Sequence, residues 1–118
     1  RNVTGVQTCA LPIFNVTTVI YKIVPAALWQ EAQARGEFAG SPVDVQDGFI
    51  HFSTAEQVAD TARKHFAGQQ DLLLVTIDAT QLPLRWEPAR GGQLFPHLYG
   101  PLPLWAVRAV ESFTVPDA

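Results

Sequence analysis

Cysteine is almost absent from this sequence, since Cys9 is the only one among its 118 residues. A lone cysteine cannot form a disulfide within the chain, and this is typical of proteins from a reducing compartment. We therefore expect a cytoplasmic protein.

Positive charge and long apolar runs are scarce as well. The formal net charge is -3 and the Lys and Arg residues form no cluster, which argues against a broad nucleic-acid surface. The longest uncharged stretch, residues 2–21, is interrupted by polar residues, whereas a membrane-spanning helix needs about 20 mostly apolar ones. The length and the 47% hydrophobic content instead fit one small globular domain that does not enter a membrane.

The familiar catalytic motifs are missing too. His51, His65 and His97 do not have the spacing of a zinc site, so we expect no metal. There is no glycine-rich phosphate loop of the P-loop or dinucleotide-binding type, and no G-x-S-x-G nucleophile turn. Any function must depend on a less common arrangement of side chains.

The N-terminal stretch has a separate explanation. Residues 3–13 read VTGVQTCALPI, which resembles the in-frame translation of a common sequencing-library adapter. We interpret residues 1–14 as an artefactual extension that contributes neither fold nor function, and residues 15–118 as one domain. Cys9 lies inside this extension.

The remaining sequence alternates between strand and helix signals. Pro25 and Gly36 bracket a run of good helix formers, and a capping box of Ser53 with Glu56, or Thr54 with Gln57, begins a second helix that ends at Gly68. Turn signals at 40–42 and 47–48 flank a short loop of uncertain shape. We predict an α+β fold with two helices, 26–35 and about 55–67, and short mixed or antiparallel strands at 17–24, 49–53, 72–77, 84–87, 94–100 and 105–115, of which 72–77 is central and buried.

Three of these strands carry pairs of polar residues at alternate positions. Residues i and i+2 of a strand point to the same face. The pairs are His51 with Ser53, Arg85 with Glu87, and His97 with Tyr99, each backed by apolar residues on the opposite face. If the three faces converge, they form a concave polar pocket suited to a small ligand.

Each of these residues also has a purely structural interpretation. His51 can be a core histidine bonded to the backbone, and Ser53 and Gln57 can be capping residues. Arg85 and Glu87 can form a surface pair of little energetic value, and Tyr99 can be a half-buried structural residue. A plain structural domain therefore stays open as an alternative.

Longer motifs resemble a known family. GFIHFS at 48–53, LRWE at 84–87 and LFPHLYGPL at 94–102 resemble domain-of-unknown-function family 952, small bacterial and plant proteins, over residues 19–113. The resemblance implies a fold similar to the ADP-ribosyltransferase superfamily and in particular to the RNA 2′-phosphotransferase of tRNA splicing. The His-x-His strand of that enzyme matches residues 49–53, with Phe49 in place of the first histidine and His51 as the second.

This resemblance also implies roles for individual residues. In the superfamily a first-strand residue holds the ribose of NAD, an aromatic ring stacks on nicotinamide, and a late-strand glutamate activates the acceptor. Lys22, Tyr99 and Glu111 are the corresponding candidates.

Together, the residue patterns and the resemblance predict a protein that binds NAD, ADP-ribose or a related phosphorylated ribose, with NAD as a possible substrate of ADP-ribosyl or phosphoryl transfer. The alternative is a non-catalytic module that binds a small ligand or a partner protein. The predicted catalytic residues are His51, Tyr99 and Glu111, and the predicted ligand-binding residues are Lys22, Ser53, Gln57, Arg85, Glu87 and His97.

Overall fold

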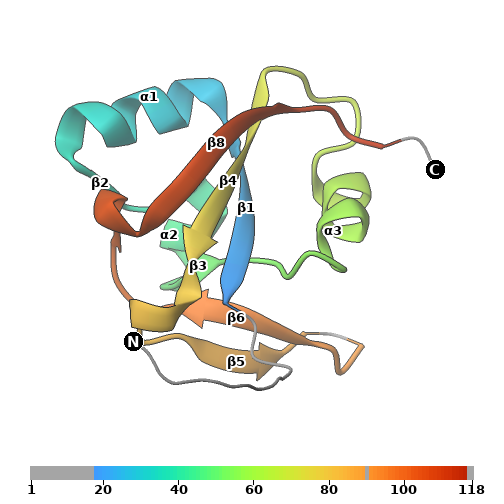
Figure 1. The fold of residues 1–118 in the computed structure, drawn as a ribbon. Helices are drawn as coiled ribbons and strands as arrows, with labels where there is room; N and C mark the ends of the chain where they lie inside the picture. The colour runs from blue at the N-terminus through green and yellow to red at the C-terminus, as the bar shows by residue number, and fades with distance from the viewer. Residues whose placement is uncertain (1–17, 90, 117–118) are drawn as a thin grey trace, which may run out of the picture.

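The computed structural model describes residues 18–89 and 91–116, and within them the chain forms the predicted α+β fold (Figure 1). Residues 1–14, which the sequence analysis interprets as an artefactual extension, lie outside the described residues. The elements are, in order, β1 (Val19–Pro25), α1 (Ala26–Arg35), β2 (Glu37–Phe38), α2 (Pro42–Asp47), β3 (Ile50–His51), α3 (Val58–His65), β4 (Leu72–Asp78), η2 (Ala79–Gln81), β5 (Arg85–Pro88), β6 (Leu94–Leu98), β7 (Leu102–Pro103), η3 (Leu104–Ala106) and β8 (Val107–Phe113).

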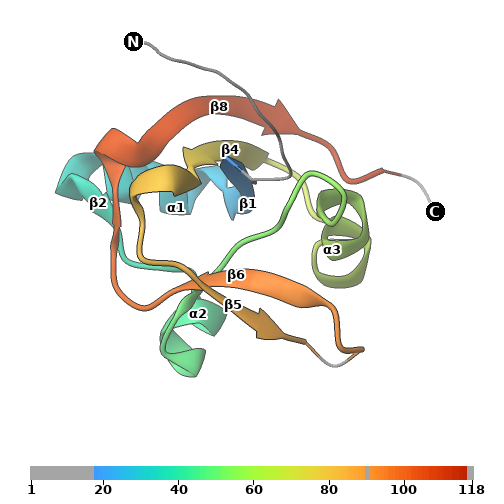
Figure 2. The same ribbon diagram turned by 60° about the horizontal axis from the view of Figure 1, so that its bottom comes forward.

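Within residues 18–89 and 91–116, the strands form two three-stranded sheets and one short pair. Their orders are β1-β4-β8, β3-β6-β5 and β2-β7, and all the pairings are antiparallel. Strand β4 is central in its sheet, as its continuous apolar run predicts. The two larger sheets lie as separate layers, with β5 and β6 below β4 in both views (Figures 1 and 2).

The main core fills the space between these layers. Ile20, Val75 and Ile77 come from one sheet, Ile50 and Leu98 come from the other, and Phe52 directly follows β3. All are buried in one cluster. The backbones of Tyr21 and Ser53 exchange two hydrogen bonds of 2.8 Å, which join β1 to the end of β3. The second sheet is therefore held to the first by apolar packing and by this backbone bridge.

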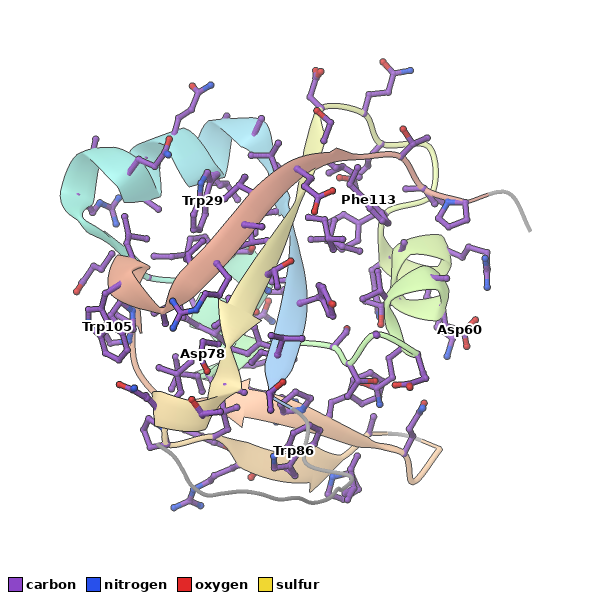
Figure 3. All side chains as sticks on the ribbon, viewed as in Figure 1. Trp29, Asp60, Asp78, Trp86, Trp105 and Phe113 are labelled. Carbon is purple, nitrogen blue, oxygen red and sulfur yellow. The ribbon has the colours of Figure 1, made fainter. Side chains whose placement is uncertain are left out.

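Helices α1 and α3 flank the sheets at opposite ends (Figure 1). Helix α1 has the predicted bounds, with Gly36 as its left-handed cap at φ 89°. Figure 3 shows Trp29 pointing from α1 into the molecule, where it is buried, and Phe113 at the end near α3, where a smaller apolar cluster lies. No helix in the described ranges is long and apolar enough to cross a membrane.

Helix α3 is shorter than predicted at both ends. Residues 55–57 form a turn and the helix begins at Val58. The Gln57 side chain accepts a 3.0 Å hydrogen bond from the Thr54 N–H, as in one arm of the predicted Thr54–Gln57 capping box. Its C-cap is Phe66, with Gly68 in the loop that follows.

The segment 42–47 differs most from the prediction, because it is a helix and the described chain therefore has three α-helices where we expected two. Pro42 begins α2, where its missing N–H costs nothing, and Gly48 ends it at φ 89°. The Asp44 carboxylate accepts a 2.8 Å hydrogen bond from the Ser41 N–H, as in one arm of a capping box. These cues are present in the sequence, so the segment was recognisable as a helix.

Candidate ligand-binding site

The register of β3, β6 and β5 places three candidate side chains in one row. His51 lies opposite His97, and His97 lies opposite Arg85. Directly opposite residues of an antiparallel sheet share a face. Glu87 lies two residues after Arg85, and Tyr99 lies two residues after His97, so both belong to the same face. The opposite face is buried and carries Ile50, Phe52, Pro96 and Leu98.

Glu87 connects two members of this row. Its Oε1 atom accepts hydrogen bonds of 2.7 Å from Nδ1 of His97 and 2.7 Å from the Tyr99 hydroxyl. The bonds from His97 and Tyr99 lower the pKa of Glu87, and the bond to Glu87 raises the pKa of Tyr99. At neutral pH Glu87 is therefore an ionised acceptor that fixes His97 with its proton on Nδ1, and Tyr99 stays protonated.

Arg85 lies over the ring of Tyr99. Its guanidinium carbon is 5.3 Å from the ring centroid, within the range of a cation–π contact. Both residues are exposed. The planar guanidinium can bind an oxyanion with two parallel N–H groups.

His51 contacts two carboxylates of α2, one on each ring nitrogen. Nδ1 is 2.6 Å from Oδ1 of Asp44, and Nε2 is 3.0 Å from Oδ2 of Asp47. A carboxylate only accepts, and a neutral imidazole has a single N–H. Both ring nitrogens of His51 therefore face a carboxylate.

Asp44 and Lys22 form a buried ion pair beneath His51. Lys22 Nζ is 3.1 Å from Asp44 Oδ2 and donates a 2.9 Å hydrogen bond to the His51 carbonyl. Burial raises the pKa of Asp44, but the His51 hydrogen bond, the Lys22 charge and the Ser41 N–H outweigh it and hold the pKa at about 2. Burial lowers the pKa of Lys22, and Asp44 opposes that effect. The pair holds the backbone and the ring of His51 in place.

Phe49 completes a cluster of rings on this face. Its ring centroid lies 4.3 Å from His97 at an interplanar angle of 29°, 4.7 Å from His51 and 5.0 Å from Tyr99. The two imidazoles meet edge to face at 5.2 Å. The face therefore combines charged groups with an aromatic surface, as ligand pockets commonly do.

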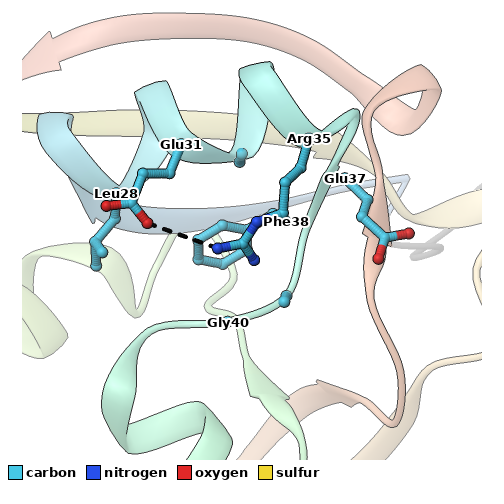
Figure 4. Close-up of a pocket in the computed structure, with 8 residues that line it drawn as sticks. Leu28, Glu31, Arg35, Glu37, Phe38 and Gly40 are labelled. Atoms are coloured by element: carbon cyan, nitrogen blue, oxygen red, sulfur yellow. Dashed lines mark ion pairs between the residues drawn. The ribbon is translucent and has the colours of Figure 1, made fainter.

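Hollows on the surface of the described residues include a larger and a smaller one. One of about 350 Å³ adjoins the ring cluster and is lined by Glu37, Ala39, Asp44, Val45, Gly48, Phe49, Ile50, Gly100 and Pro101. The other, of about 50 Å³, lies between α1 and β2 beside the Glu31–Arg35 ion pair (Figure 4). The smaller one has room for little more than water. Neither hollow is lined by a predicted site residue, and the larger one reaches the ring cluster only through Asp44 and Phe49.

Comparison of the chain with protein-family models agrees with the family that the sequence motifs indicate. A family model described as "Protein of unknown function (DUF952)" matches residues 23–110. The chain belongs to the DUF952 family. The family resemblance expected from the sequence motifs is thus confirmed, and the likeness to ADP-ribosyltransferases stays a prediction.

Solved structures of protein CC0527 from Caulobacter crescentus are similar to this DUF952 chain. The crystal structure is 47% identical with a TM-score of 0.79, over 82% of this chain and 87% of that one. The solution NMR structure is 48% identical with a TM-score of 0.72, over 80% and 83%. Among curated proteins no match was found.

Four residues predicted for the site of this DUF952 chain lie away from the shared face. Strand β3 ends at His51, so Ser53 pairs with β1 instead, and its buried hydroxyl lies 3.2 Å from that of Thr61. Gln57 is buried and donates to the Leu94 carbonyl at 2.7 Å. Lys22 is turned inward as described above. Glu111 lies on β8 opposite Leu74, in the other sheet.

Three residues that the sequence analysis did not assign to the site do contact it, namely Asp44, Asp47 and Phe49. The capping pattern around Asp44 could have indicated α2 in the sequence, but the place of its two carboxylates next to His51 is seen only in the structure. Phe49 alternates with His51 and so belongs to the same face. In the described residues of this DUF952 chain, no group of three or more His, Cys, Asp or Glu side chains is arranged to hold a metal ion.

Proposed function

We propose that this protein binds a phosphorylated ribose, such as NAD, ADP-ribose or a simpler ribose phosphate, on the face formed by β3, β6 and β5. The observation that carries the proposal is the cross-strand row of His51, His97 and Arg85, two imidazoles and a guanidinium beside aromatic rings. N–H donors of this kind suit phosphate and hydroxyl oxygens, and the exposed ring of Tyr99 suits a planar base.

Each group has a chemical role in this proposal. Arg85 binds phosphate through its exposed guanidinium, which Tyr99 orients by cation–π contact. His51 contacts an oxygen of the ligand through Nε2, in place of the exposed Asp47 carboxylate. The adjoining hollow of about 350 Å³ lies within the range of small-molecule sites and has room for part of a nucleotide.

Transfer chemistry is the second candidate function, favoured by the ionised carboxylate of Glu87 on this face. The resemblance to ADP-ribosyltransferases implies cleavage of the nicotinamide–ribose bond through an oxocarbenium-like state, with a glutamate that orients the acceptor. Glu87 fits that role better than Glu111, which lies in the other sheet. His51 and Tyr99 would hold the ribose and the departing ring.

Calorimetric titration with ADP-ribose, NAD and ribose 5-phosphate tests the proposal. Arg85→Ala should weaken binding about 10-fold or more, because a charge-assisted hydrogen bond to phosphate is lost. Arg35→Ala is the matched control, since Arg35 is an exposed arginine on α1 that pairs with Glu31. Arg35→Ala should bind each of the three ligands with the same affinity as the wild type.

The results separate the candidates. Absence of heat for all three ligands at millimolar concentration would exclude the binding function. Mass spectrometry of NAD incubated with the protein then distinguishes transfer from binding alone, because free nicotinamide forms only if the bond is cleaved. A bound ligand without any product identifies a non-catalytic module.

A further inference from the structure

The larger hollow, of about 350 Å³, has a chemistry different from that of the β3-β6-β5 face. We infer that it binds a small planar organic cation, such as an amidinium or guanidinium compound, with the Glu37 carboxylate as its anionic contact. Neither Arg85 nor His51 lines the hollow, so this binding is independent of the proposed function.

The walls of the hollow are mostly apolar and come from three segments of the chain. Ala39 follows β2, Val45 is exposed on α2, Phe49 and Ile50 lead into β3, and Pro101 precedes β7. The ring of Phe49 offers a surface on which a flat or positively charged group can pack. The volume lies within the range of small-molecule sites.

Glu37 supplies a negative charge to this hollow. It alternates with Ala39, which also lines the hollow, while Phe38 between them is buried in the core. Figure 4 shows the Glu37 side chain pointing away from Arg35, whose guanidinium pairs with Glu31 instead. Among the ion pairs of residues 18–89 and 91–116, none involves Glu37. Its charge is therefore available to a ligand.

The other acid that lines the hollow is already neutralised. Asp44 is buried, and Lys22 Nζ lies 3.1 Å from its Oδ2 atom. No lysine or arginine is among the described residues that line the hollow. The hollow therefore combines one uncompensated negative charge with apolar walls. Such a surface attracts a cation and repels a phosphate, which suits Arg85 on the neighbouring face instead.

The shape of the two partners favours a planar cation over a simple ammonium ion. An amidinium or guanidinium group presents two parallel N–H donors to the two oxygens of a carboxylate, and such charge-assisted bonds are about twice as strong as neutral ones. An ammonium ion is a compact, strongly hydrated point charge without this match. The flat body of a planar ligand can also pack on Phe49 while its cationic end binds Glu37.

Benzamidine and benzamide form a suitable pair of probes, since their shapes are nearly the same and only benzamidine is positively charged at pH 7. Titrations followed by amide NMR spectra measure both affinities. We expect the wild type to bind benzamidine about 10-fold more tightly than benzamide, because only the cation forms charge-assisted bonds. The amide signals of Val45, Gly48 and Gly100 should shift, since these residues line the hollow.

Two variants test the role of charge from different elements. Glu37→Gln keeps the shape of the side chain and should bind benzamidine about 10-fold more weakly than the wild type, with no change for benzamide. Val45→Lys adds a positive charge at an exposed position of the wall and should also weaken binding of benzamidine. Glu56→Gln is the control, because Glu56 is an exposed glutamate before α3 that does not line the hollow. Its affinity for benzamidine should equal that of the wild type.

Several results would overturn the inference. These are equal binding of benzamidine and benzamide by the wild type, no effect of Glu37→Gln, and no binding of benzamidine at millimolar concentration. Tighter binding of an acetylated Gly-Arg-Gly peptide than of benzamidine would also contradict it, since the partner would then be a protein. Ribose 5-phosphate should bind the wild type and Glu37→Gln alike, so a failure of the proposed function is detected separately.

Discussion

Asp44 is the residue on which the arrangement of the site depends. Its buried carboxylate contacts Lys22, Ser41 and His51, which belong to three different parts of the chain. A buried ion pair contributes little against an apolar replacement, but removal of one partner leaves the other charge without compensation. The sequence position of Asp44, inside a turn-rich segment, gives no hint of this role by itself.

Asp44→Asn should therefore lower the free energy of unfolding by about 3 kcal/mol at pH 7, because Lys22 would stay buried without a counter-charge. Urea denaturation followed by circular dichroism measures this change. Asp60→Asn, which removes an exposed pair with Arg63, should change the same quantity by about 0.5 kcal/mol or less.

Acid unfolding provides a further check on Asp44. Its pKa of about 2 in the folded protein lies below the value of about 3.9 for an unperturbed aspartate. A lowered carboxyl pKa gives stability that is fully present above about pH 5 and is lost as the pH falls through 2. The wild type should lose stability over that interval more steeply than Asp44→Asn, and equal slopes would show that Asp44 is not paired as described.

At the scale of elements, α2 and its carboxylates follow Gly40, a residue whose backbone conformation favours glycine. Gly40 has φ 116°, and a Cβ added there would lie 2.9 Å from the Cβ of Asp44. That atom is next to the helix backbone and cannot move away like the end of a long side chain. Both the conformation and the space therefore require glycine.

Gly40→Ala should destabilise the protein by about 3 kcal/mol, from backbone strain and from the clash with Asp44. Gly68→Ala is the matched comparison, because Gly68 has φ 79° but open space around its Cα. Gly68→Ala should lower the free energy of unfolding by only about 1–2 kcal/mol. Thermal unfolding of the two variants tests the difference, and equal costs would mean that the contact with Asp44 is not tight.

For the whole molecule, the decisive feature is that one core joins both sheets. Phe52 lies between the site residue His51 and the bridge residue Ser53, and its 2% exposed ring belongs to the main cluster. The polar face of the β3-β6-β5 sheet is therefore backed by the same core that supports β1 and β4. Its rigidity derives from this packing, because β3 itself has only two residues.

Phe52→Ala should cost about 4 kcal/mol of unfolding free energy, since a large buried ring is replaced by a cavity. It should also broaden the NMR signals of His51 and His97. Trp105→Ala is the control, because this ring is 60% exposed on η3. A loss of stability in Trp105→Ala as large as in Phe52→Ala would contradict the assignment of the core.

Local patterns predicted a large part of this structure. The bounds of α1, the central position of β4 and the shared faces of Arg85 with Glu87 and His97 with Tyr99 follow from capping residues and two-residue alternation. Helix α2 was missed although its capping cues are local, because a six-residue helix has too little apolar periodicity to be noticed. That the residues on the shared face of the β3-β6-β5 sheet bind a ligand stays a prediction.

The sequence by itself determined which side chains share a face of each strand and where the first helix begins and ends, because backbone geometry and capping act over a few residues. Tertiary structure alone decided that β6 lies between β3 and β5, which brings His51, His97 and Arg85 into one row. It also separated Glu111 from them and turned Lys22 inward to Asp44. Strand order and burial of charge depend on contacts between segments distant in the chain, and no local pattern encodes the free energy of those contacts.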